Sequence, residues 1–226
     1  MVGAYPVPQN PQQFYGPSAW DIPNRLSLSF NYQLRGLNGG SGVIGHLTGG
    51  WGISGTSIFQ SGAPLTIGNT NNYQAVCANA GTCPSPANPA IGYAPQSGDY
   101  NADGNNNDYP DAVAYAQSTS RTSFLSGSIP ASDFAVPAFG TEGNEKVGRF
   151  RAPNFAETDV NFYKETSITE RVNFELRFEF FNIFNRPNLL NVDLNYPDSI
   201  NPNGNFGKAT ASHLPRFWQL GGKITF

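Results

Sequence analysis

The residues best suited to chemistry lie in one polar stretch, Asp99–Asp111. Oxygen side chains at its first, third and fifth positions, followed by Gly104, are typical of the first half of a calcium loop. Pro110 replaces the bidentate Glu of position twelve, a role open to Asp108 or Asp111. We expect weak calcium binding, with a Kd of about 10⁻⁴–10⁻³ M. The expected ligands are Asp99, Asn101, Asp103, Asn105, Asp108 and Asp111. The alternative is a metal-free turn rich in Asn, Asp and Gly.

The remaining reactive residue types form no catalytic arrangement. His46 and His213 are the only histidines, and neither lies in a nucleophile or HExxH context. Glu175 and Glu179 would be about 13 Å apart on one strand, too far for a paired acid and base. We therefore expect no enzyme activity and no cofactor other than calcium.

Two cysteines, Cys77 and Cys83, lie six residues apart in a segment rich in Gly, Asn and Pro. We expect a small disulfide loop exposed to an oxidising compartment, and two free thiols are the alternative. With no His nearby, the pair makes a poor metal site.

Composition favours a β protein with large polar loops. Only 13% of the 226 residues are charged, and the net charge of −3 gives no electrostatic case for binding nucleic acid. Gly 25 and Pro 18 indicate many turns. No apolar run approaches the 18 residues of a membrane helix. The N-terminus has neither the basic start nor the apolar core of a signal peptide.

Five segments alternate between apolar and polar residues, which predicts strands with one apolar face. They are residues 25–35, 51–60, 159–163, 172–180 and 216–226. The last is long enough to cross a bilayer as a tilted strand of about 9–11 residues. Alone, it would also fit a soluble β-sandwich.

The connections between these segments alternate in length. Short connections follow the first and third segments, whereas about ninety-five residues follow the second and about thirty follow the fourth. Outer-membrane barrels combine short periplasmic turns with long extracellular loops in this way. We therefore expect an all-β fold made of antiparallel transmembrane strands, with extracellular loops at about 62–156 and 187–215. The last strand then ends on the periplasmic side.

The apolar positions should face lipid, and the charged ones should line the lumen. The expected membrane-facing residues are Leu26, Leu28, Phe30, Tyr32, Trp51, Ile53, Val172, Phe174, Leu176, Phe178, Phe180, Trp218, Leu220, Ile224 and Phe226. Trp51, Trp218, Phe226 and also Trp20 suit the aromatic belts at the membrane interface. Because five strands cannot close a membrane barrel, we expect residues 1–226 to form the C-terminal segment of a larger one.

Several of these segments together resemble a known family. Gly49–Thr66 contains GGW, SG and SGAPLT in the order of a TonB-dependent receptor strand. Phe174–Pro187 ends in FFNIFNRP and resembles the penultimate strand of that family. Asn205–Lys208 and Pro215–Phe226 complete the set, and the match is closest to the Oar-like subgroup. That subgroup couples a carboxypeptidase-regulatory-like domain to a plug and a barrel of the 22-stranded type.

The resemblance implies an outer-membrane transporter, energised through TonB, for a siderophore, vitamin, glycan or peptide. No residue here matches a plug or a TonB-contacting motif, so TonB would act only through a region outside this sequence. The C-terminal strand resembles the signal read by the barrel-assembly machinery. The competing hypothesis is a secreted, soluble, calcium-braced β module that binds glycan or protein.

Overall fold

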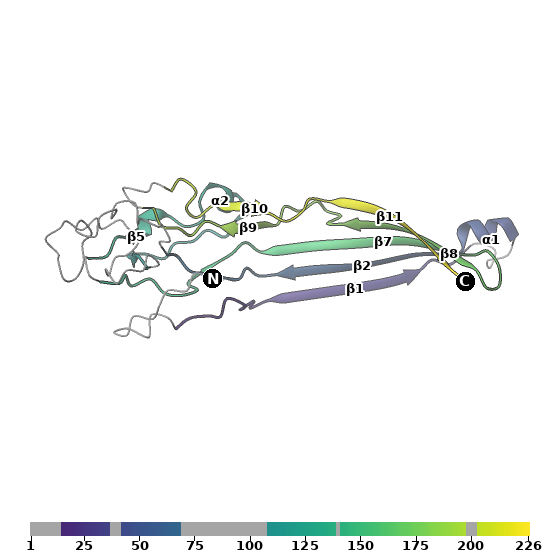
Figure 1. The fold of residues 1–226 in the computed structure, drawn as a ribbon, viewed down its shortest axis with the longest axis horizontal. Coiled ribbons are helices and arrows are strands. Elements are labelled where there is room, and N and C mark those ends of the chain that lie inside the picture. Colours follow the sequence, from purple (N-terminus) through teal and green to yellow (C-terminus); the bar gives the residue numbers. More distant parts are fainter. Residues whose placement is uncertain (1–14, 37–41, 69–107, 139–140, 198–202) are drawn as a thin grey trace, which may run out of the picture. The chain divides into compact units, whose positions relative to one another are not determined.

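A computed structural model describes residues 15–36, 42–68, 108–138, 141–197 and 203–226. Within these ranges the chain divides into two compact units (Figure 1). The sheet unit comprises residues 23–61, 154–188 and 213–226, and the loop unit comprises residues 1–22, 62–153 and 189–212. The loop unit thus combines most of both long connections. None of the helices in the described ranges is long and apolar enough to cross a membrane.

The sheet unit is built on five antiparallel strands in the order β1-β2-β7-β8-β11. They are β1 (Arg25–Gln33), β2 (Trp51–Gln60), β7 (Phe155–Ser167), β8 (Asn173–Phe181) and β11 (Phe217–Thr225). All five predicted strands are present, and β7 begins four residues earlier than the alternation indicated. In the described residues β1 and β11 each pair on one side only, so the sheet is open.

The connections at the two ends of the sheet differ as predicted in length. At one end β1 leads to β2 through α1 (Gly42–Thr48), and β7 leads to β8 through a five-residue turn at 168–172. In that turn the amides of Ile168 and Thr169 donate to the Val172 carbonyl. The helix α1 was not predicted, since the sequence indicated only a short connection there. Both long connections leave from the opposite end.

The loop unit has short elements of its own: β3 (Pro64–Leu65), β4 (Asp111–Ala112), α2 (Arg121–Ser126), a 3₁₀ turn (Ala131–Asp133), β5 (Phe134–Ala135), β6 (Phe150–Arg151), β9 (Leu189–Val192) and β10 (Ala209–Ser212). Strand β3 pairs with β6, β4 with β5, and β9 with β10. Ser120 caps α2 by accepting a hydrogen bond from the Ser123 amide at 3.1 Å.

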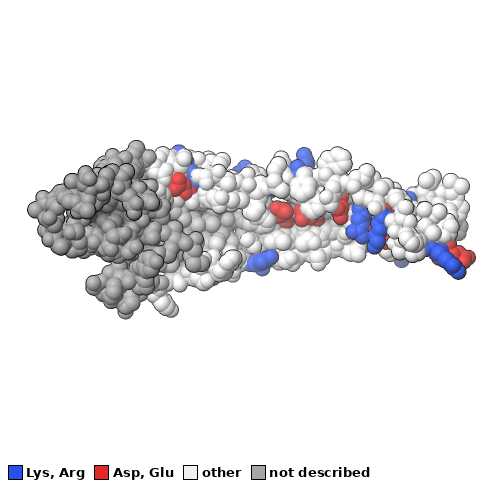
Figure 2. Space-filling view, viewed as in Figure 1, with Lys and Arg blue, Asp and Glu red and all other residues white. Residues whose placement is uncertain are grey.

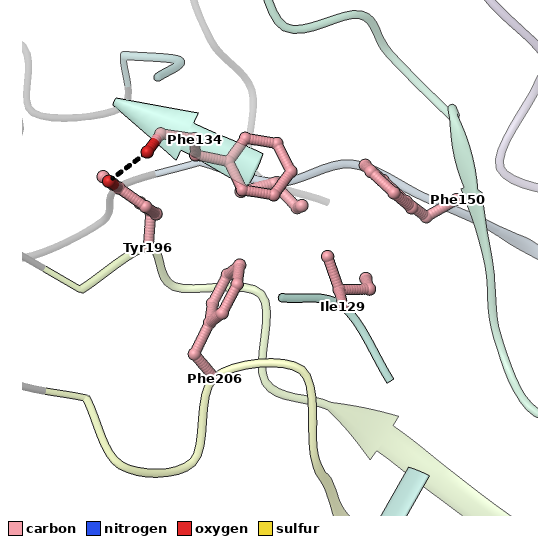
Figure 3. Close-up of a cluster of buried hydrophobic side chains, with 6 residues drawn as sticks. Ile129, Phe134, Phe150, Tyr196 and Phe206 are labelled. Atoms are coloured by element: carbon pink, nitrogen blue, oxygen red, sulfur yellow. Dashed lines mark hydrogen bonds between the residues drawn. The ribbon is translucent and has the colours of Figure 1, made fainter. Parts of the chain in front are cut away.

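A buried cluster holds the loop unit together (Figure 3). It consists of Ile67, Ile129, Phe134, Phe150, Tyr196 and Phe206. The Phe134 ring meets the rings of Phe150, Tyr196 and Phe206 edge-on, at centroid distances of 5.9, 5.9 and 6.0 Å. The Tyr196 hydroxyl donates to the Phe134 carbonyl at 2.9 Å, which satisfies both buried groups. Side chains from the two long connections therefore share one core.

Candidate functional site

The register of the five strands separates the sheet's side chains into two faces. Because alternate residues point to opposite sides, every residue paired with a member of one face belongs to that face. The apolar face carries Leu26, Leu28, Phe30, Tyr32, Trp51, Ile53, Gly55, Ser57, Phe59, Ala156, Thr158, Val160, Phe162, Lys164, Thr166, Phe174, Leu176, Phe178, Phe180, Trp218, Leu220, Gly222 and Ile224. All the strand residues predicted to face the membrane are on it. Val172 instead closes the β7–β8 turn, and Phe226 follows β11.

Three polar residues of the apolar face have hydrogen-bonding partners. The hydroxyls of Ser57 and Thr158, directly opposite each other on β2 and β7, lie 3.0 Å apart. The Lys164 ammonium donates to the carbonyls of His46 and Gly49 at 2.9 and 2.7 Å, and lies over the Trp51 ring. A polar group can be transferred from water to an apolar environment at low cost only when it is hydrogen-bonded.

The polar face carries the sheet's acidic residues and most of its amides. Its members are Arg25, Ser27, Ser29, Asn31, Gln33, Gly52, Ser54, Thr56, Ile58, Gln60, Phe155, Glu157, Asp159, Asn161, Tyr163, Glu165, Ser167, Asn173, Glu175, Arg177, Glu179, Phe181, Phe217, Gln219, Gly221, Lys223 and Thr225. Figure 2 shows acidic and basic side chains gathered together over the strands within a largely uncharged surface.

Several charged residues of the polar face lie close together on β8 and β11. Arg177 pairs with Glu175 of its own strand, and Gln219 donates to Glu179 from β11. Lys223 lies opposite Glu175 in the register. Glu175 and Glu179 lie on the same face of β8, as predicted, and Arg177 lies between them. This arrangement suits a hydrated wall and provides no acid–base pair.

A tyrosine braces the polar face across three strands. Tyr163 of β7 lies over Gly52 of β2, where a Cβ atom would overlap its ring. Its hydroxyl donates to the Asn31 side-chain oxygen of β1 at 3.1 Å. An aromatic ring covering a strand glycine restores the side-chain packing that the glycine lacks. The wall is thus held rigid near its short-connection end.

An open hollow of about 670 Å³ lies within the sheet unit, at the ends of β1, β2 and β7 that are opposite the short connections. Its lining includes Arg25, Gln60, Phe155 and Arg186. The His213 ring meets the Phe155 ring edge-on at 5.1 Å. His46 is exposed in α1, and His213 is exposed before β11.

The predicted calcium loop falls mostly outside the described residues. Asp99, Asn101, Asp103 and Asn105 lie there, as do Cys77 and Cys83. Asp111 accepts a hydrogen bond from the Asn144 amide at 3.1 Å, and Asp108 is buried. Among the described residues, no three His, Cys, Asp or Glu side chains form a group that could hold a metal. Calcium binding stays a prediction.

The loop unit contains a buried carboxylate that the sequence did not single out. The Glu145 side chain is 0% exposed, and neither of its carboxylate oxygens has a hydrogen-bond partner. Burial raises its pKa from 4.5 to about 7. Burial, together with the charges of Glu142 and Glu145, raises the pKa of Tyr109 to about 12. No local sequence pattern could reveal Glu145, because its burial depends on the packing of distant segments.

An open antiparallel sheet with one apolar face and one charged face fits the wall of a membrane β-barrel. The comparison with known families agrees. A family model described as an outer membrane beta barrel domain matches residues 2–219. The chain therefore belongs to this family and is located in the outer membrane. No curated protein and no solved structure matches it. Membership of the family removes the secreted soluble alternative.

Proposed function

We propose that this chain forms part of the wall of a TonB-dependent receptor that takes up a small ligand, either a siderophore, a glycan or a peptide. The observation that carries the proposal is the continuous polar face, which runs across all five strands. A wall that only anchored the protein would need no charged ladder such as Glu175, Arg177, Glu179 and Lys223. The ordered motifs at 49–66, 174–187 and 215–226 favour the TonB-dependent class and its Oar-like subgroup.

The proposal includes an orientation. The apolar face lies in lipid, the polar face lines the lumen, the short connections are periplasmic and the loop unit is extracellular. The open edges at β1 and β11 would leave backbone groups unpaired in lipid, which costs several kcal/mol per group. Further strands must therefore complete the barrel.

Uptake by cells of the source organism tests the transport proposal. The gene that encodes the chain is deleted and then restored, and uptake of a labelled ferric siderophore, oligosaccharide or peptide is measured. We expect the restored gene to recover uptake of one class, and a protonophore to abolish that uptake, since TonB draws on the proton gradient. Equal uptake of all three classes with and without the gene would refute transport and leave the membrane location intact.

The C-terminal strand supports a proposal about assembly. Phe226 follows β11 directly, and its side chain is 97% exposed. We propose that the barrel-assembly machinery reads this strand. Phe226→Ala should lower the fraction of chain that reaches the heat-modifiable, membrane-inserted state, whereas Leu214→Ala, in the connection before β11, should not. Equal assembly of both variants would contradict this role.

A further inference from the structure

The helix α1 is attached to the sheet by two side chains of the apolar face. The Trp51 indole nitrogen donates to the Leu47 carbonyl at 3.0 Å. Lys164 donates to the carbonyls of His46 and Gly49. These carbonyls belong to the last turn of the helix and the residue after it, where helix carbonyls have no partners within the helix. Because Trp51 and Lys164 both project from the apolar face, α1 is held on the apolar side of the sheet, at the end that carries the short connections.

The passage from α1 into β2 fixes this position. Gly50 adopts a φ of +74°, a conformation that favours glycine, and a Cβ there would overlap the Glu165 carbonyl oxygen. The Glu165 amide donates to the Gly50 carbonyl at 2.8 Å. The helix therefore leaves the sheet through a tight turn, which limits its freedom to swing away.

The outward side of α1 is an apolar stripe. Val43, Ile44 and Leu47 are 76%, 54% and 65% exposed, and Leu47 lies four residues after Val43 and three after Ile44, on one side of the helix. Gly45 is buried and marks the opposite side, which packs on the protein. No Lys, Arg, Asp or Glu occurs in Gly42–Thr48. The stripe would meet water if nothing covered it.

The surroundings of the stripe indicate what covers it. It continues the apolar face through the Trp51 ring and the aliphatic stem of Lys164, and that face belongs to an outer-membrane barrel. Amphipathic aromatic rings and long basic side chains are typical of the level where lipid headgroups begin. A seven-residue helix is far too short to span the bilayer, but it can lie along its surface.

We propose that α1 is an interfacial helix that inserts Val43, Ile44 and Leu47 into the boundary between the headgroups and acyl chains of the outer membrane. The phospholipid surface is its partner. Since the helix carries no Lys, Arg, Asp or Glu, apolar burial drives the contact, and the contact is insensitive to salt. The leaflet that α1 contacts follows from the proposed orientation of the barrel. In that orientation α1 lies in the periplasmic leaflet.

Depth-dependent fluorescence quenching tests the proposal on the full chain in its assembled barrel. Cys77 and Cys83 are changed to Ser, and an environment-sensitive NBD dye is attached to Val43→Cys, to Leu47→Cys or to the control Glu170→Cys. Glu170 is exposed in the other short connection. The protein is placed in phosphatidylethanolamine and phosphatidylglycerol vesicles with or without brominated acyl chains.

We expect brominated lipid to quench the dye at positions 43 and 47 at least threefold more than at 170, with no change between low and high salt. Iodide should quench position 170 selectively. Water-like emission with iodide quenching at 43 and 47 would overturn the proposal. Energy transfer between copies labelled there, without lipid quenching, would overturn it in favour of a second chain as the partner.

Two controls keep the result interpretable. All labelled positions are exposed, so heat-modifiable mobility should show the same folded barrel for each variant. The orientation is tested separately on whole cells with a membrane-impermeant maleimide. Labelling of Glu170→Cys from outside would reverse the proposed orientation, while the vesicle result for α1 would stand by itself.

Discussion

The sheet unit and the loop unit place their apolar residues in opposite ways. In the loop unit, rings such as Phe134, Phe150 and Phe206 are buried together. Among the described residues of the sheet unit, the buried apolar ones are Ala156 and Tyr163, whereas large ones from Leu26 to Ile224 are exposed. The loop unit buries its large apolar side chains, as proteins in water do, whereas the sheet unit exposes them, as proteins in lipid do. The two units of this one chain are therefore suited to two different solvents, water and lipid.

The largest expected difference between the units concerns the aromatic core. Phe134→Ala removes the ring at the centre of the cluster and should destabilise the loop unit by about 3–5 kcal/mol. Hydrogen exchange should then accelerate in β5 and in β9–β10, while the strands of the sheet stay protected. Val113→Ala, at an exposed position of the same unit, is the matched control. Equal acceleration in both units would mean that they do not have separate cores.

The second test addresses the two faces of the sheet. Leu28→Arg puts a charge on the apolar face, where lipid contact should cost about 2–4 kcal/mol near the membrane midplane. Ser29→Arg changes the next residue of β1, on the polar face, and should cost less than about 1 kcal/mol. Denaturant midpoints of the reconstituted barrel measure both. If the two variants lose the same stability, the apolar face does not meet lipid.

Alternation identified the strands well because each face of the sheet meets a uniform environment. The period of two in β1, β2, β8 and β11 is visible in the sequence for that reason. The first part of β7 was not predicted because its two faces differ little in polarity. Phe155, Glu157 and Asp159 lie on one face, and Ala156 and Thr158 lie on the other. The polar face was likewise predictable from its charged residues.

Elements that depend on distant contacts could not be predicted in this way. The helix α1 contains Gly42 and Gly45, which have low helix propensity, and it is held by Lys164, more than a hundred residues away. The core of the loop unit joins Ile67 to Phe206 without any periodic pattern. Glu145 was missed for the same reason.

The third test uses that carboxylate. The folded loop unit holds the Glu145 pKa at about 7, above its ordinary value of 4.5, so the folded state favours the neutral acid. This preference stabilises the folded state fully below pH 4.5, and its contribution is lost as the pH rises from 4.5 to 7. The free energy of unfolding should fall by about 3 kcal/mol over that range. Thermal unfolding of the loop unit from pH 4.5 to 8 measures the loss.

Glu145→Gln should remove this pH dependence, because the amide does not titrate. Glu142→Gln is the matched control and should keep most of it, since Glu142 accepts a hydrogen bond from the Tyr109 amide and is not fully buried. The same slope in the wild-type chain and in Glu145→Gln would assign the effect to another group.

The smallest expected effect concerns calcium and decides whether the loop unit has a second means of stabilisation besides its core. With a Kd of about 10⁻⁴–10⁻³ M, 2 mM calcium would stabilise the folded unit by about 0.6–1.8 kcal/mol. A chelator should therefore lower the Tm of the loop unit and leave the sheet unchanged. Asp103→Asn tests the site itself, with Asp193→Asn, elsewhere in the loop unit, as the control. If the chelator changes neither the Tm nor the protease resistance of residues 99–111, the segment is a metal-free polar turn and the aromatic cluster is the main source of the loop unit's stability.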